Sequence, residues 1–135
     1  NKLADIFLVQ ILRHVINEGL VLQGMLAGMA HPQLSRLMSA IHQQPEEPWT
    51  IETMAETALM SRAKFAALFK ESVGQSPNDY LTDLRIAIAQ GLLKNDQPVS
   101  FVANKVGYEH GSALARVFRK KIGLSPKEWL LKLKK

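Results

Sequence analysis

The chain has 135 residues, no cysteine and a formal net charge of +5 at pH 7. This length allows one domain or two very small ones with a real hydrophobic core. The lack of cysteine excludes disulfides, thiolate zinc sites and thiol nucleophiles, and it permits a reducing cytoplasm. No signal peptide is recognisable, and the longest weakly polar run, residues 20–30, is too short to span a bilayer. We therefore expect a cytoplasmic chain without a membrane partner. Because it begins with Asn1, we also expect it to be part of a longer protein.

The positive charge is concentrated at the C-terminal end. Residues 1–48 carry 3 Lys and Arg against 4 Asp and Glu, and residues 49–104 carry 5 against 6. Residues 105–135 carry 9 against 2, a surplus of +7. Such a block indicates a surface that faces phosphate groups. A solvated helix face with a lysine-rich tail is the alternative.

The first 48 residues predict a helical connector. Leu3–Asn17 has the broad apolar face of a helix that is buried on two sides. Glycines interrupt the next segment, and Gly24-x-x-x-Gly28 has little predictive value here, because that motif indicates helix packing in membrane-length apolar helices. A further helix opens at Pro32, and the proline- and acid-rich residues 44–48 form the predicted linker.

The longest predicted helix runs from Pro77 to Lys94. Ser76 suits its N-cap and Pro77 its first helical position. One apolar stripe follows at spacings of three and four: Tyr80, Leu81, Leu84, Ile88 and Leu92. At about 1.5 Å per residue this helix is about 27 Å long. We expect it to act as a strut between the segments on its two sides.

Those two segments resemble each other. Residues 69–81 and residues 118–130 share Phe, Gly, Ser-Pro and an aromatic-Leu pair, all at a constant offset of 49 residues. In the first copy, Thr50 caps a short helix, Ile51–Ala58, and Ser61 caps a second helix, Arg62–Val73. A short helix, a tight turn and a capped second helix form the helix-turn-helix arrangement.

The second copy repeats this pattern. Its first helix has an apolar face made by Val99, Val102, Ala103 and Val106, and its second helix covers residues 111–122. Ser125-Pro126-x-Glu128 has capping-box spacing and begins a last helix. The predicted fold is therefore all-α, with two helix-turn-helix units, residues 49–75 and 96–135, joined by the linker helix, residues 76–95. Together they form one domain, residues 49–135, which the connector, residues 1–48, precedes.

A family resemblance rests on the second copy, which carries the pattern Gly107-Tyr108-x-x-x-Ser112-x-Leu114-x-Arg116-x-Phe118-Arg119-Lys120-x-x-Gly123-x-Ser125-Pro126. The first copy carries the companion pattern Ser61-Arg62…Phe65…Phe69…Gly74-x-Ser76-Pro77-x-x-Tyr80-Leu81. Together the two patterns resemble the DNA-binding domain of AraC/XylS-type transcription regulators over residues 49–129. Residues 20–49 resemble the connector of the subgroup with an N-terminal cupin sensor. The resemblance implies sequence-specific binding to duplex DNA, with one helix in each of two successive major grooves. It also implies an effector bound by a domain absent from this chain.

The resemblance further implies which residues contact DNA. In the first unit these are Arg62, Ala63, Lys64, Ala66 and Ala67. In the second unit they are His110, Gly111, Ser112, Ala113, Ala115, Arg116, Arg119, Lys120 and Lys121. Alanines offer only methyl contacts to thymine, so we expect the second unit to read bases and the first to position the domain. Arg116 is the expected base or phosphate contact, with a surface salt bridge as the alternative.

Other kinds of chemistry find no support in the sequence. It contains no Gly-rich phosphate loop, no nucleophile elbow, no His-Glu-x-x-His motif and no placed pair of carboxylates. We therefore expect no enzyme, no catalytic residue, no cofactor and no metal site. The alternative function is a protein-interaction module, in which the first copy and the apolar Leu3–Ile16 segment bind RNA polymerase or another subunit. Salt dependence of duplex binding distinguishes these two functions.

Overall fold

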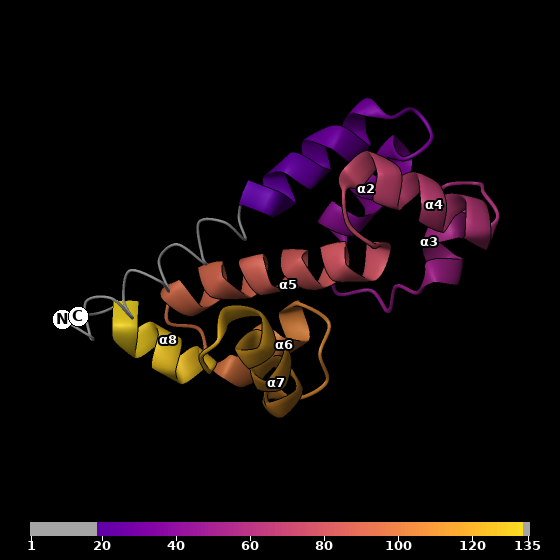
Figure 1. The fold of residues 1–135 in the computed structure, drawn as a ribbon. Helices are drawn as coiled ribbons and strands as arrows, with labels where there is room; N and C mark the ends of the chain where they lie inside the picture. Colours follow the sequence, from indigo (N-terminus) through magenta and orange to yellow (C-terminus); the bar gives the residue numbers. More distant parts are fainter. Residues whose placement is uncertain (1–18, 134–135) are drawn as a thin grey trace.

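The computed structural model describes residues 19–133, which are helical and contain no strand (Figure 1). Residues 19–30 form a helix, and seven more follow: α2 (Ser35–Gln43), α3 (Ile51–Thr57), α4 (Arg62–Val73), α5 (Pro77–Lys94), α6 (Val99–Lys105), α7 (Gly111–Ile122) and α8 (Pro126–Leu133). The all-α prediction is confirmed. The predicted helix Leu3–Asn17 lies outside the described residues. Between residues 19 and 133, no helix has the length and apolar character needed to cross a membrane.

Local signals set the ends of the helices. Thr50 Oγ1 accepts a hydrogen bond from the Thr53 backbone N–H at 3.1 Å, and Thr53 Oγ1 accepts one from the Thr50 N–H at 2.9 Å. This reciprocal pair satisfies two N–H groups that the start of α3 leaves free. Ser61 caps α4 with one hydrogen bond, which its Oγ accepts from the Lys64 N–H at 3.3 Å. Helices α4 and α7 end at Gly74 and Gly123, whose φ angles of 96° and 92° are left-handed and suit glycine.

Helix α5 contributes to two hydrophobic cores through two different faces. Its buried residues are Tyr80, Leu81 and Leu84 in the first core, and Ile86, Ala89 and Leu93 in the second. At about 100° per residue, the centres of these two faces lie about 180° apart around the helix axis. Figure 1 accordingly shows α2 and α4 on one side of α5, and α6, α7 and α8 on the other. The predicted single stripe was wrong in its C-terminal part, since Ile88 and Leu92 are only half buried.

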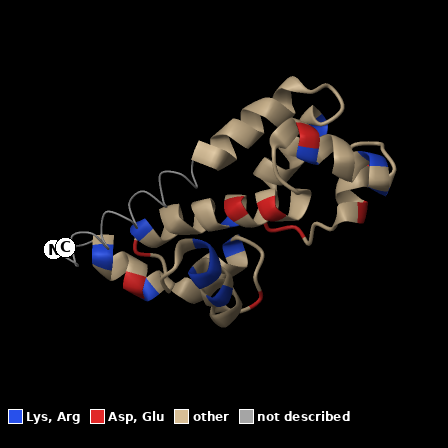
Figure 2. Cartoon of the chain, viewed as in Figure 1, with Lys and Arg blue, Asp and Glu red and all other residues tan. Residues whose placement is uncertain are grey.

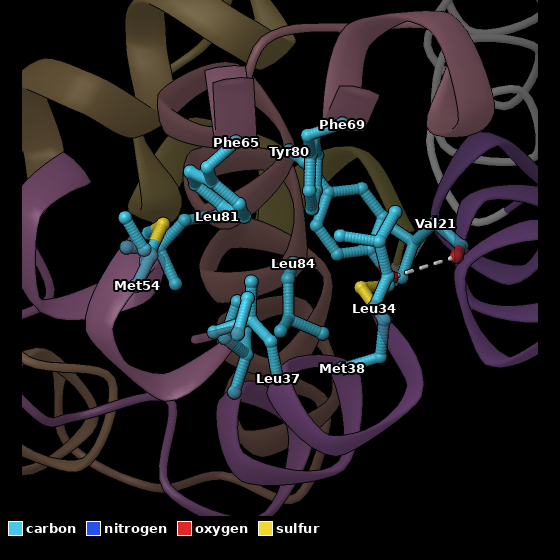
Figure 3. Close-up of a cluster of buried hydrophobic side chains, with 13 residues drawn as sticks. Val21, Leu34, Leu37, Met38, Met54, Phe65, Phe69, Tyr80, Leu81 and Leu84 are labelled. Atoms are coloured by element: carbon cyan, nitrogen blue, oxygen red, sulfur yellow. Dashed lines mark hydrogen bonds between the residues drawn. The ribbon is translucent and has the colours of Figure 1, made fainter. Parts of the chain in front are cut away.

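The two cores correspond to the two repeats. The first unit (α3 and α4) encloses its core together with α2, the first part of α5 and the helix of residues 19–30 (Figure 3). The second unit (α6 and α7) does so with α8 and the second part of α5. Each core contains a pair of aromatic rings packed edge to face: the ring centres of Phe69 and Tyr80 lie 5.8 Å apart in the first, and those of Phe118 and Trp129 lie 5.6 Å apart in the second.

The helix of residues 19–30 packs closely against the first unit. A Cβ atom on Gly24 would lie 2.5 Å from Tyr80 Cε1, and one on Gly28 would lie 2.6 Å from Met38 Cγ. Both glycines therefore let the helix backbone approach α5 and α2 more closely than any side chain allows. The expectation that glycines interrupt this segment was wrong, and the Gly-x-x-x-Gly spacing marks close helix packing in this chain.

A hydrogen-bond chain fixes the same contact. Tyr80 Oη donates to the Val21 carbonyl at 3.1 Å, drawn as the dashed line in Figure 3, and lies 2.6 Å from His42 Nε2. Burial raises the pKa of Tyr80 and lowers the pKa of His42, so both are neutral at neutral pH. Because the only Tyr80 proton goes to Val21, His42 must donate from Nε2. His42 thus has a structural role in this contact.

Candidate nucleic-acid interface

Helix α4 presents a small and weakly charged outer face. Its exposed residues among the predicted contacts are Arg62, Ala63, Lys64 and Ala67, whereas Ala66 is half buried. Arg62 Nη1 lies 3.0 Å from Glu52 Oε1 of α3. A backbone N–H at the start of α3 and the guanidinium of Arg62 hold the pKa of Glu52 below its usual value, so this carboxylate is charged at neutral pH. It therefore competes with any phosphate for Arg62.

Helix α7 presents a more strongly cationic outer face. Ser112, Arg116 and Lys120 are exposed and four residues apart, which places them in one line along the helix. Within residues 19–133, neither Arg116 nor Lys120 forms an ion pair. Arg119 is exposed beside them, and its Nη2 lies 3.4 Å from Glu128 Oε1 of α8. Figure 2 shows Lys and Arg gathered on α7, whereas α8 and the first unit carry both signs of charge.

The start of α7 has no side-chain cap. Its N-cap residue is His110, which is exposed and makes no capping hydrogen bond. The first N–H groups of a helix have no acceptor within the helix, so those of Gly111 and Ser112 remain available to an anion. Gly111, Ala113 and Ala115 are half buried, so only part of each is accessible on this face. Helix α4, by contrast, begins with the cap from Ser61.

This arrangement can be compared with known proteins. Residues 54–132, more than half of the chain, match the family model of a helix-turn-helix domain. The transcriptional regulator AlkR of Acinetobacter baylyi is 42% identical over 105 residues, which are 77% of this chain and 34% of that protein. An AraC-like transcription regulator of Streptomyces lividans is 37% identical over 129 residues, 94% of this chain and 42% of that protein. The chain belongs to the AraC-type helix-turn-helix family.

The solved structures agree with the family. The DNA-binding domain of AdpA, crystallised in complex with a target DNA, superposes with a TM-score of 0.67 and is 31% identical. The match covers 70% of this chain and 86% of that one. The chain spans less than half the length of the two sequence relatives. That residues 20–49 are the connector of the cupin-sensor subgroup stays a prediction.

The AraC-type domain places Lys121 differently from the other predicted cations. Its Nζ lies 3.0 Å from Asp83 Oδ1 of α5, and the two side chains are 27% and 9% exposed. Asp83 Oδ2 also accepts a hydrogen bond from Gln75 Nε2 at 3.0 Å. A phosphate contact by Lys121 stays a prediction, but it requires the ammonium to leave a nearly buried carboxylate. The spacing of α7 residues in the sequence carries no signal for this partner on α5.

Arg85 is the second residue whose partners the sequence did not indicate. It lies on α5, and its guanidinium binds backbone carbonyls of residues 44–48. Nε donates to the Pro45 carbonyl at 2.9 Å, and Nη2 donates to the Glu47 carbonyl at 2.7 Å. Its Cζ also lies 5.6 Å from the centre of the Tyr108 ring. Arg85 therefore connects residues 44–48 to the turn between α6 and α7.

Proposed function

We propose that this AraC-type domain binds specific duplex DNA with α4 and α7 in two successive major grooves and regulates transcription. The observation that carries the proposal is the outer face of α7, where Arg116 and Lys120 are exposed and have no ion-pair partner among residues 19–133, beside an uncapped helix start. The likeness to a domain crystallised with a target DNA supports it. Helix α5, about 27 Å long, plus the width of the attached units is compatible with the 34–36 Å of one DNA turn.

The two units divide the work in this proposal. Arg116 contacts a base edge or a phosphate, and Lys120 contacts a phosphate next to it. Arg119 adds a phosphate contact only when its guanidinium leaves Glu128. The N–H groups of Gly111 and Ser112 add a phosphate site at the start of α7. Helix α4 offers only the methyl groups of its alanines and the ammonium of Lys64, because Arg62 is paired with Glu52. The second unit therefore reads the sequence, and the first unit docks in the next groove.

In the longer protein, residues 49–135 are the DNA-binding domain and residues 1–48 connect it to a part that binds an effector. The greater length of the relatives supports this division. RNA polymerase is a further partner in this proposal, and the site of action is the cytoplasm. One observation favours the alternative, a protein-interaction module: Leu22 and Leu26 are 54% and 60% exposed on the helix of residues 19–30.

A salt series tests the proposal. The chain is titrated with a duplex selected in vitro from a random-sequence library and with a scrambled duplex of the same length. We expect log affinity to fall linearly with log salt, by about 0.9 for each phosphate that the protein neutralises. The selected duplex should also remain the tighter ligand at every salt concentration. A flat salt response, or no binding at low salt, would contradict the proposed DNA-binding function and favour the protein-interaction module.

A further inference from the structure

Two polar side chains of α5 occupy the boundaries between its two core-facing surfaces. The face toward the first unit and the face toward the second unit lie on nearly opposite sides of the helix, which leaves two seams along α5. Asp83 and Arg85 are two residues apart and therefore about 200° apart around the axis. One lies on each seam. Each of them contacts groups from both sides of the domain.

On the first seam, Asp83 joins α7 to the loop that follows α4. Gln75, which follows α4, donates to Asp83 Oδ2 at 3.0 Å, and Lys121 of α7 lies 3.0 Å from Oδ1. Asp83 is only 6% exposed, so water screens this ion pair weakly. One carboxylate thus restrains the loop after α4 and the C-terminal part of α7.

On the second seam, Arg85 joins residues 44–48, which precede the first unit, to the second unit. The two carbonyls that it binds, those of Pro45 and Glu47, lie directly before the first unit, and Tyr108 lies in the turn between α6 and α7. A Cβ atom on Gly107 would lie 3.1 Å from both Arg85 Cζ and the Glu46 carbonyl oxygen. The guanidinium therefore fills a closely packed space between the linker and the turn.

We propose that Asp83 and Arg85 are positioning residues that fix the rotation of the second unit about α5, and so determine where α4 meets DNA once α7 is bound. A helix alone fixes a distance, but each unit is held to it by one apolar face. Directional polar contacts on both seams oppose rotation in either sense. This inference rests on the proposed two-groove function and adds to it the residues that set the register.

The test compares a long and a trimmed duplex. The wild-type chain first selects a duplex from a random library, and a second duplex is then trimmed to the segment that α7 protects in a hydroxyl-radical footprint. The wild type should protect two segments about one DNA turn apart and bind the trimmed duplex at least tenfold more weakly. Two variants are compared with it: Asp83→Asn combined with Lys121→Met, which leaves neither charge unpaired, and Arg85→Met.

Both variants should keep the α7 segment of the footprint, and the α4 segment should become weak or spread over more positions. Their affinities for the long and trimmed duplexes should differ by less than threefold, because α4 then contributes little. This ratio cancels any gain in phosphate binding by a released lysine. If both variants keep the tenfold ratio and two sharp footprint segments, the positioning role is overturned.

Two further variants separate positioning from loss of stability. Met38→Ala leaves a cavity in the first core beside Gly28 of the helix of residues 19–30, so its melting temperature should fall while the tenfold ratio stays. Arg85→Lys keeps the positive charge but has no fork to bind two carbonyls, so it should show an intermediate ratio even if Arg85→Met fails to fold. If the wild type itself shows no loss on trimming, the two-groove function fails before the positioning role is tested.

Discussion

The two helices of the first unit, α3 and α4, begin with side-chain caps, whereas their counterparts in the second unit, α6 and α7, do not. Helix α3 has the Thr50–Thr53 capping box and α4 has the Ser61 cap, but Pro98 and His110 start α6 and α7 without a capping side chain. Capping side chains satisfy the same N–H groups that an anion would bind. The third N–H of α4, that of Lys64, bonds to Ser61 Oγ, whereas the third N–H of α7, that of Ala113, bonds to the His110 carbonyl at 3.1 Å. The start of α7 therefore carries no capping side chain where an anion would bind.

The outer faces of α4 and α7, the second helices of the two units, differ in their exposed cationic groups. Arg62 on α4 is held by Glu52, and its neighbours are alanines. Arg116 on α7 is exposed and, within the described part of the chain, has no carboxylate partner. Two units with one backbone plan thus differ in their free cationic groups. A shared fold fixes where a helix lies, and the outer residues alone determine what that helix binds.

The largest expected effect on stability comes from a substitution that disrupts α5, the helix that both units share. Leu84→Pro in the middle of α5 removes a backbone hydrogen bond and clashes with the preceding turn, which costs about 3 kcal/mol or more. We expect this variant to be largely unfolded in urea titrations and to lose DNA binding. Gly91→Ala in the same helix is the matched control. Nothing lies within 4 Å of its added Cβ, so it should gain about 0.5–1 kcal/mol. A folded Leu84→Pro variant with full affinity would contradict the shared-helix argument.

The second prediction addresses base reading directly. Arg116→Ala should cost about 1–3 kcal/mol in binding to the selected duplex, and preference at one base position should relax, because a bidentate Arg–guanine contact has that worth. Arg62→Ala is the control, since Glu52 already holds this arginine. Titration of both variants against the selected duplex and its single-base variants measures the difference. Equal losses from the two substitutions would show that the units do not divide the work.

The ends of the helices and the repeat could be predicted from the sequence, because they depend on local signals. Capping threonine and serine, proline at the first helical position and glycine after the last turn act within four residues of a helix end. The α4, α5 and α7 boundaries accordingly agree with prediction. The exposed line of Ser112, Arg116 and Lys120 also follows from helical periodicity and the apolar positions between them.

The two faces of α5 and its polar contacts could not be predicted in this way. Periodicity identifies apolar residues spaced by three and four. Ile86, Ala89 and Leu93 have this spacing, but so do Leu81, Leu84, Ile88 and Leu92 of the predicted stripe. Which core each residue joins depends on where the second unit packs. The partner of Asp83, Lys121, is 38 residues away in the chain. No local pattern specifies such a pair, and the sequence therefore placed Lys121 with the DNA-facing cations.

The third prediction exchanges the turn residues of the two units. Leu59 and Gly107 occupy corresponding turns with left-handed φ angles of 58° and 97°. Leu59 is 80% exposed, so Leu59→Gly loses little burial and should stabilise the domain by about 1 kcal/mol or less through relief of backbone strain. Gly107→Leu should cost about 1 kcal/mol or more, since it adds strain and crowds Arg85. Urea denaturation of each variant measures both signs, and changes of the same sign would contradict this account.

The smallest effects are expected from single lysines, and they separate binding from reading. Lys120→Ala should weaken binding to selected and scrambled duplexes alike and reduce the slope of log affinity against log salt by about 1, because it removes one phosphate contact. Lys64→Ala should change both quantities less, since α4 mainly docks. Both lysines are exposed and, within residues 19–133, lack carboxylate partners, so the pair is matched in its surroundings. The measurement is a salt series with each variant on both duplexes. If Lys64→Ala abolished the preference for the selected duplex while Arg116→Ala left it intact, the roles of the two units would be reversed, and base reading would belong to the capped, alanine-rich helix.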